Sequence, residues 1–348
     1  MGIMLLKHRS SESACWLRIS VYSLFISFAL FAGHKLIAFY TPLQGLPSIA
    51  TRVRDIEKEV DPEDFCFAIL GDNKNDHKVF PEIMSKINDD PDISFVIHLG
   101  DMVKQPNKIF YQEFLGMVRA FLQKPFLSIP GNHDIDGQGN SIFYEQAFDK
   151  THYTASIGGA CLVFTDTEQL VSEKEQNWLR RALWRNRKSK PLIVFMHIPL
   201  YDPRGHDNHH ALRKKIADQL LSIFDEYGVD HVYAGHIHGY WTGQWRTIPY
   251  TISGGAGAEL YSHKISHGFY HYLKVRIQNG HIYEKVKSVS STPFSRALNT
   301  IKANVKVEFL GTGLIAAIFG SSLISVCLWI RQWIQRKGRQ NIFFPVPL

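Results

Sequence analysis

Residues 126–134 read Phe-Leu-Ser-Ile-Pro-Gly-Asn-His-Asp, an apolar run followed by a glycine and three polar residues. Such a short apolar run ending at Pro-Gly is typical of a buried strand that leads into a tight turn. Two earlier stretches share this pattern: 65–72 reads FCFAILGD and 94–101 reads SFVIHLGD. Each predicts a strand after which a glycine lets the backbone turn sharply, so that the next polar side chain points into the crevice at the strand end.

Further along the chain, apolar runs and helical patterns alternate. Additional strands are predicted at 161–165, 192–196 and 231–234. The last two end in His197 and in Gly235-His236-Ile237-His238. Apolar residues at helical spacing predict helices at 79–88, 110–122, 173–185 and 211–227. A hairpin is predicted to join 269–277 to 281–289 through Asn279-Gly280. This alternation predicts an α/β protein with sheets covered by helices, in one catalytic domain over 65–292.

The polar residues at the strand ends form a set that suits metal ions. The candidate ligands are Asp72, Asp101, Asn132, His197, His236 and His238. Carboxylate, amide oxygen and imidazole without thiolate favour Mn, Fe, Zn, Ni or Co ions. The set is too large for one ion and about right for two that share a carboxylate. Two ions roughly 3.5–4 Å apart lower the pKa of a shared water and hold the attacking and leaving oxygens of an in-line displacement.

The motifs in this order resemble those of the calcineurin-like metallophosphoesterases: Asp-x-His, Gly-Asp, Gly-Asn-His-Asp/Glu, His and Gly-His-x-His. The resemblance covers Phe65 to about Gly257. It implies a four-layer α-β-β-α sandwich and a hydrolase that cleaves a phosphomonoester or phosphodiester by attack of a metal-bridging hydroxide. By the same resemblance Asp72, Asp101 and His238 hold the first metal. Asp101, as the bridge, then holds the second metal with Asn132, His197 and His236.

Two more residues receive roles from the resemblance, and one position departs from it. His133 is expected to protonate the leaving-group oxygen, and Asp134 to orient His133. Lys74 stands where many family members have a histidine. Four explanations remain open: fewer protein ligands at the first metal, an oxygen from Asn73 or Asn75, a water in place of the missing ligand, or Lys74 facing the substrate phosphate as a point charge.

The two ends of the chain predict membrane segments. Residues 309–330 read FLGTGLIAAIFGSSLISVCLWI, without a charged residue, which is long enough to cross a bilayer as a helix. The basic tail 331–348 follows and marks the cytoplasmic side. Residues 19–33 are also apolar, and we favour an uncleaved signal anchor within 1–40 over a cleaved signal peptide. The segments 41–64 and 293–308 are predicted as linkers. The catalytic domain is therefore expected on the non-cytoplasmic side, with both termini cytoplasmic.

Charge and chemistry limit the function classes. Of 39 basic and 32 acidic residues, 1–60 and 295–348 together carry 14 basic and 5 acidic, which leaves 25 basic against 27 acidic between them. This nearly neutral middle gives no basic face for nucleic acid, and no nucleic-acid binding is expected. The main alternative to an enzyme is a metal-binding receptor or scaffold that has lost catalysis. Within the enzyme class, a lipid-linked phosphoester is the alternative substrate.

Overall fold

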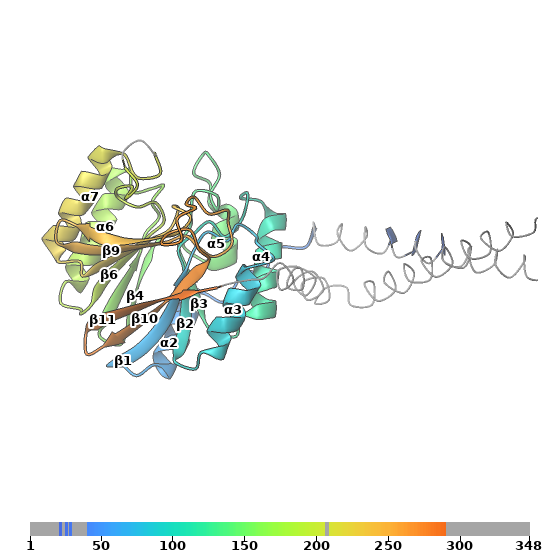
Figure 1. The fold of residues 1–348 in the computed structure, drawn as a ribbon, viewed down its shortest axis with the longest axis horizontal. Coiled ribbons are helices and arrows are strands. Elements are labelled where there is room, and N and C mark those ends of the chain that lie inside the picture. Colours follow the sequence, from blue (N-terminus) through green and yellow to red (C-terminus); the bar gives the residue numbers. More distant parts are fainter. Residues whose placement is uncertain (1–20, 23–24, 27, 30–39, 206–208, 290–348) are drawn as a thin grey trace, which may run out of the picture. The chain divides into compact units, whose positions relative to one another are not determined.

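The computed structural model describes residues 21–22, 25–26, 28–29, 40–205 and 209–289. Its described residues from 43 onward belong to one compact unit, built on two β-sheets with helices around them (Figure 1). The first sheet has the strand order β11-β10-β1-β2-β3, and the second has the order β4-β5-β6-β7-β9-β8. A mixed α/β fold with two sheets, as predicted, is therefore confirmed.

The first sheet places three polar loops at one edge. It consists of β1 (Asp64–Leu70), β2 (Ile93–His98), β3 (Phe126–Ser128), β10 (His271–Gln278) and β11 (His281–Ser288). β1, β2 and β3 are parallel, so their carboxyl ends lie at the same edge. β10 pairs antiparallel with β1 and forms the expected hairpin with β11.

The second sheet brings two histidine loops to its own carboxyl edge. It consists of β4 (Tyr153–Ile157), β5 (Ala160–Phe164), β6 (Leu192–Met196), β7 (His231–Ala234), β8 (Tyr240–Trp245) and β9 (Ile248–Ser253). β5, β6, β7 and β9 are parallel, and β4 and β8 are antiparallel edge strands. β4, β8 and β9 had not been predicted.

Six described helices accompany the sheets: α2 (Ile49–Glu59), α3 (Phe80–Asp89), α4 (Lys108–Phe121), α5 (Ile142–Phe148), α6 (Glu173–Asn186) and α7 (Lys214–Tyr227). Local sequence explains several of their ends. The side chains of Asn107 and Ser172 accept hydrogen bonds from N–H groups in the first turns of α4 and α6. Gly228 follows the last residue of α7 and caps the helix, because its φ of 66° is the left-handed conformation that glycine adopts without strain.

Strand β6 shows how the layers are packed. Its alternate residues Ile193 and Phe195 join a core between the two sheets, which also contains Phe67 and Phe95 of the first sheet. The rings of Phe67 and Phe195 meet across that interface at 6.5 Å. The remaining β6 side chains join a second core with residues of α6 and α7. Because both faces are covered, the strand is apolar throughout, and each fully buried large side chain contributes roughly 1.5–3 kcal/mol.

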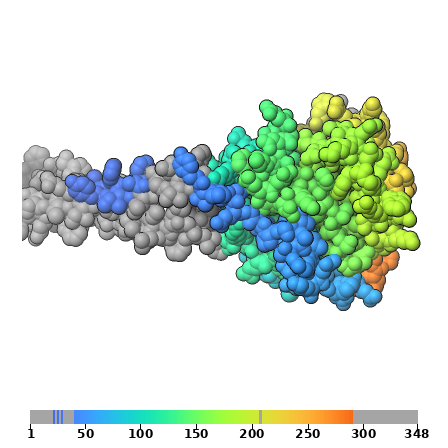
Figure 2. Space-filling view, turned by 180° about the vertical axis from the view of Figure 1, so that it is seen from behind, coloured from blue at the N-terminus to red at the C-terminus, as the bar shows by residue number. Residues whose placement is uncertain are grey.

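Helix α2 corrects one prediction. The segment 41–64 was expected to be a linker, but it contains α2, whose Ile49 and Ile56 are buried in the core between the sheets. The buried Arg52 donates hydrogen bonds to the main-chain oxygens of Phe126 and Phe148. Viewed from behind, the blue segment that carries α2 lies on the domain surface beside green residues (Figure 2). The folded domain therefore begins before residue 65.

The predicted membrane segments fall largely or wholly outside the described residues. Residues 309–330 and the linker 293–308 lie there entirely, and 19–33 is described only at 21–22, 25–26 and 28–29. Within the described part of the chain, no helix has the length and apolar character needed to cross a membrane.

Candidate metal centre

The predicted ligands come together where the carboxyl ends of the parallel strands of both sheets meet. Asp72, Asp101 and Asn132 follow β1, β2 and β3 of the first sheet. His197 follows β6 and His236 follows β7 of the second sheet. Residues that are far apart in sequence thus converge because parallel strands place their ends at one edge.

The backbone of these loops is held in an uncommon conformation. Asp72, Asp101 and His236 have φ values of 63°, 57° and 68°, in the left-handed region that non-glycine residues rarely occupy. Main-chain hydrogen bonds from Asp72 N to Gly100 O and from Gly235 N to His197 O tie the loops to one another. Strained residues of this kind persist only where the surroundings determine them, and they cluster at functional sites.

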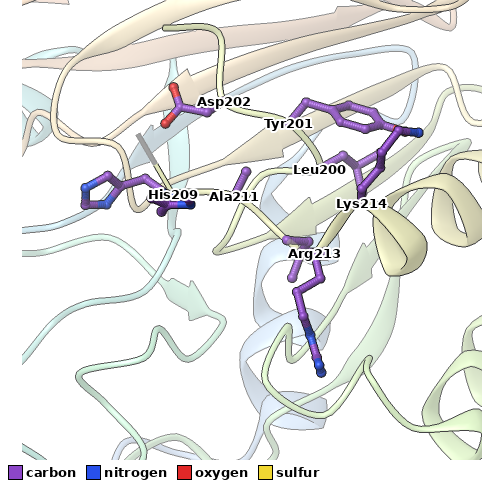
Figure 3. A pocket seen from close by; sticks show the side chains of 9 residues that line it. Leu200, Tyr201, Asp202, His209, Ala211, Arg213 and Lys214 are labelled. Carbon is purple, nitrogen blue, oxygen red and sulfur yellow. The ribbon is translucent and has the colours of Figure 1, made fainter. Parts of the chain in front are cut away.

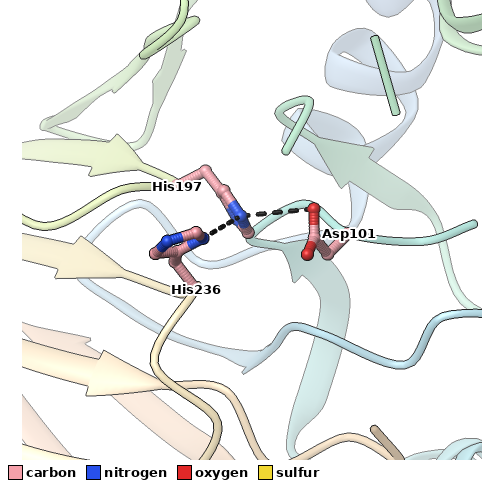
Figure 4. A group of neighbouring side chains, drawn as sticks. All are labelled: Asp101, His197 and His236. Carbon is pink, nitrogen blue, oxygen red and sulfur yellow. Dashed lines mark hydrogen bonds and ion pairs between the residues drawn. The ribbon is translucent and has the colours of Figure 1, made fainter. Parts of the chain in front are cut away.

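The side chains of Asp101, Asn132 and His236 converge on a fourth, at the imidazole nitrogen Nε2 of His197. This atom lies 3.3 Å from Oδ1 of Asp101, 3.1 Å from Oδ1 of Asn132 and 3.2 Å from Nδ1 of His236. Three of these residues are shown in Figure 4, where the dashed contacts meet at His197. Nδ1 of His197 donates to Leu99 O at 2.7 Å, which leaves Nε2 facing the other groups. Asp101, His197 and His236 therefore form one candidate metal group, with Asn132 beside it.

The electrostatics of this group fit a cation. Burial raises the pKa of Asp101, but the neighbouring groups His197, Lys74 and His133 together outweigh burial and hold that pKa below its usual range. For His197 burial lowers the pKa, yet the Asp101 carboxylate raises it to about 9. In this group the lone pairs of Asp101, Asn132 and His236 surround a position that favours positive charge. A proton on His197 supplies that charge here, and a metal ion would supply it in the same place. Carboxylate, amide and imidazole donors suit the predicted borderline ions, so the residues fit the metal.

Gly131 permits this close approach. A Cβ atom at position 131 would lie 2.3 Å from Oδ1 of Asp101 and 2.8 Å from Cε1 of His197. Real Cβ atoms do not approach so closely, so a larger residue would force the ligand loops apart. The glycine of the Pro-Gly-Asn-His-Asp motif is therefore needed for space, in addition to the turn predicted for it.

A second candidate group is formed by Asp72, Asp101 and His238. Nδ1 of His238 donates to Glu259 O at 2.6 Å, and its Nε2 lies 3.5 Å from Oδ1 of Asp72. Among the described residues, Nε2 of His238 has no hydrogen-bond partner although it is buried. Burial is the main cause that raises the pKa of Asp72 to about 7 and lowers that of His238 to about 4.

The loop residues Asn73, Lys74 and Asn75 do not add an oxygen ligand. Oδ1 of Asn73 pairs with Nε2 of His98 at 2.9 Å. The Asn75 side chain accepts from Lys104 N and donates to Phe110 O. The side-chain oxygens of Asn73 and Asn75 are therefore both engaged in hydrogen bonds within the fold. This argues against the explanation that one of them completes the first metal position. The Lys74 ammonium instead lies 3.2 Å from Oδ2 of Asp101.

The predicted role of Asp134 is wrong. Its buried carboxylate accepts main-chain N–H bonds from Met102, Val103 and Gly131 rather than contacting His133. Nδ1 of His133 instead pairs with Lys104 O at 2.9 Å, and its main-chain N–H donates to Oδ1 of Asp101. A buried N–H left without an acceptor costs about 1–3 kcal/mol. Asp134 therefore fixes the two ligand loops, and the Lys104 carbonyl orients the histidine.

Two aromatic neighbours of the centre were not assigned to it from sequence. The Tyr261 ring stacks on the His238 ring, with 4.1 Å between the ring centroids. The centroid of the His210 ring lies 5.0 Å from that of Tyr261 and 5.6 Å from that of His236. No pattern around Tyr261 signals its position, because it follows no predicted strand and belongs to no motif. His210 also lines a cavity of about 390 Å³ with Tyr201, Asp202 and their neighbours (Figure 3).

The fold and the donor set together define the metallophosphoesterase class. A family model for calcineurin-like phosphoesterases matches residues 66–240, half of the chain. The chain belongs to this family, and it is a hydrolase acting on phosphoric ester bonds.

Two curated relatives and one solved structure illustrate the similarity. A probable cyclic nucleotide phosphodiesterase, RPA0124 of Rhodopseudomonas palustris, is 27% identical over 51% of this chain and 69% of its own. The serine/threonine-protein phosphatase CPPED1 of Danio rerio is 26% identical over 49% of this chain and 62% of its own. Purple acid phosphatase PPD1 from yellow lupin (Lupinus luteus) seeds has a TM-score of 0.54 at 16% identity, covering 65% of this chain and 51% of that one. The last comparison shows the fold alone.

Proposed function

We propose that this protein is a metal-dependent phosphoesterase that hydrolyses a phosphomonoester or phosphodiester at the centre around Asp101. The observation that supports it most is the convergence of Asp101, Asn132 and His236 on Nε2 of His197. A bound metal there would lower the pKa of a water and stabilise charge that develops on the phosphoryl group.

The chain's own residues supply the positioning and the proton. The Lys104 carbonyl accepts from Nδ1 of His133, which leaves Nε2 of that ring available to the leaving-group oxygen. An imidazole suits this task because its usual pKa lies near neutrality. The Asp134 carboxylate holds the loops of Asp101 and Asn132 at a fixed separation through its three N–H bonds.

The proposal predicts metal-dependent turnover. The purified full-length chain is expected to hydrolyse p-nitrophenyl phosphate, its bis ester or both, to lose that activity with EDTA and to recover it with Mn²⁺. Release of p-nitrophenolate measures each step. Metal bound without turnover on either ester would instead favour the alternative, a receptor or scaffold with impaired catalysis. The two relatives are described as a phosphodiesterase and a phosphatase, so both ester types belong in the assay.

We also propose that the protein is held in a membrane by residues within 1–40 and 309–330, with the catalytic domain on the non-cytoplasmic side. The apolar run 309–330 and the flanking basic tail support this. Several described apolar side chains near the N-terminus are exposed, which suits contact with lipid: Val21, Tyr22, Phe25, Ile26 and Phe28. Two tethers would keep the centre near the bilayer, which favours a lipid-linked phosphoester as the narrower substrate class.

Protease protection tests this topology. In sealed vesicles with the cytoplasmic face outward, added protease is expected to remove epitope tags from both termini and to leave the catalytic domain intact until detergent is added. Immunoblots against each tag and the domain measure the outcome. Cleavage of the domain before detergent would contradict the proposed side.

A further inference from the structure

Lys74 lies against the one carboxylate that both metal positions need. Its Nζ atom is 3.2 Å from Oδ2 of Asp101, and the two side chains are 19% and 1% exposed. Among the described residues, Oδ2 of Asp101 has no hydrogen-bond partner. The lysine therefore makes an ion pair, almost out of water, with an oxygen that would otherwise be free to bind a metal.

The scaffold holds Lys74 in that place from both sides. Lys74 has a φ of 45°, and its main-chain N–H donates to Asp101 O at 3.0 Å. The neighbouring Asn73 is anchored through His98, and Asn75 through the main chain of Lys104 and Phe110. The backbone of Lys74 is therefore fixed beside Asp101, at a place from which its ammonium reaches Oδ2 of that residue.

The ammonium lies at the first metal position. The Asp101 carboxylate that Lys74 contacts belongs, with Asp72 and His238, to the candidate group for that metal.

The second position has a different set of neighbours. Asp101 meets His197 there through Oδ1, and Asn132 and His236 complete the group. A metal at the second position would use Oδ1 of Asp101, so it would not compete with Lys74 for Oδ2 of that residue. We propose that the Lys74 ammonium takes the place of the first metal ion, so that the protein holds one tightly bound ion, at Asp101, Asn132, His197 and His236. The inference rests on the proposed function and departs from the two ions expected from sequence.

Charge balance supports a single ion. The first position would have to bind a metal through Oδ2 of Asp101, the atom that Lys74 already contacts. Two divalent ions and the ammonium would then face only two carboxylates, Asp72 and Asp101, in a site shielded from water. Like charges at this range repel strongly where water is excluded. With a neutral histidine in place of the lysine, the repulsion between the ammonium and the ions is absent, and the ring supplies a nitrogen donor.

Metal stoichiometry tests the inference directly. The purified full-length chain, stripped of metal, reloaded with Mn²⁺ and gel-filtered, is expected to retain one ion per chain by mass spectrometry. Lys74→His is expected to retain two. Electron paramagnetic resonance gives a second readout, because two Mn²⁺ ions roughly 3.5–4 Å apart couple magnetically and a single ion does not. The wild-type protein should show the uncoupled spectrum and Lys74→His the coupled one.

Three further variants separate charge, ligand and position. Lys74→Gln removes the charge without supplying a histidine and should bind a second ion more weakly than Lys74→His. Asp72→Asn should bind one metal ion per chain, the same number as the wild-type protein. If the wild-type protein held an ion at the first position, this variant would instead bind one ion fewer than the wild-type protein. Lys58→His, at an exposed site on α2, is the matched control and should also stay at one. Circular dichroism checks that each variant is folded.

Two ions in the wild-type protein with a coupled spectrum, or a folded Lys74→His that holds only one, would overturn the inference. Hydrolysis assays on the same samples separate it from the proposed function. One bound ion without turnover would contradict the proposed phosphoesterase activity and support the single-ion inference. Two bound ions with turnover would support the activity and contradict the single-ion inference.

Discussion

Asp101→Asn is expected to abolish hydrolysis and most metal binding. Oδ1 of Asp101 lies 3.3 Å from Nε2 of His197 and also accepts the main-chain N–H of His133. The asparagine keeps the shape of the side chain but loses the charge that balances a cation. A metal contributes several kcal/mol of transition-state stabilisation, so kcat/KM should fall by at least about 10³-fold.

Two measurements check this result: kcat/KM on both p-nitrophenyl esters, and metal content of the variant by mass spectrometry. The matched control is Asp55→Asn, because Asp55 is exposed and pairs with Lys58 on the surface of α2. Such pairs contribute little to stability. Near wild-type activity and metal content in Asp101→Asn would show that Asp101 does not hold the catalytic ion.

His133→Asn is expected to keep the metal and to slow turnover. His133 contacts the centre through its backbone and through Lys104 O, and it belongs to neither candidate metal group. General acids contribute roughly 10²–10⁴-fold, so kcat on an ester with a poor leaving group should fall within that range. The loss should be smaller with p-nitrophenolate, because this leaving group needs little protonation.

Comparing phenyl phosphate with p-nitrophenyl phosphate measures that difference, and metal content confirms that the centre is intact. His281→Asn, an exposed position on the β10–β11 hairpin, serves as the control. An equal loss of rate on the two esters would assign His133 to positioning rather than to proton transfer. Full activity on both would remove it from the mechanism.

Much of the fold could be predicted because its signals are local. The strand at 192–196 and the strand at 231–234 were predicted with the bounds that the structure has, since both are short apolar runs between turns. Helix α2 could not be found in this way. Its sequence IATRVRDIEKE is rich in charge, and the burial of Arg52 depends on carbonyl groups from β3 and α5 that are distant in sequence.

The candidate centre shows the same division. A glycine and a polar residue after an apolar run identify Asp72, Asp101 and Asn132, because strand ends gather at one edge. The partners of those side chains were not predictable. Asp134 was predicted to orient its sequence neighbour His133. Its carboxylate oxygens instead accept hydrogen bonds from main-chain N–H groups on two separate loops. Tyr261 lies over His238 only because the chain returns there after β9.

The centre draws its donors from both sheets, with Asp101 and Asn132 on one and His197 and His236 on the other. An ion held by all four would act as a cross-link between the two halves of the sandwich. Anything that binds only the folded state stabilises it, by about 2.7 kcal/mol at a hundred times its dissociation constant. Metal supply would therefore set how long the folded protein persists as well as how fast it works.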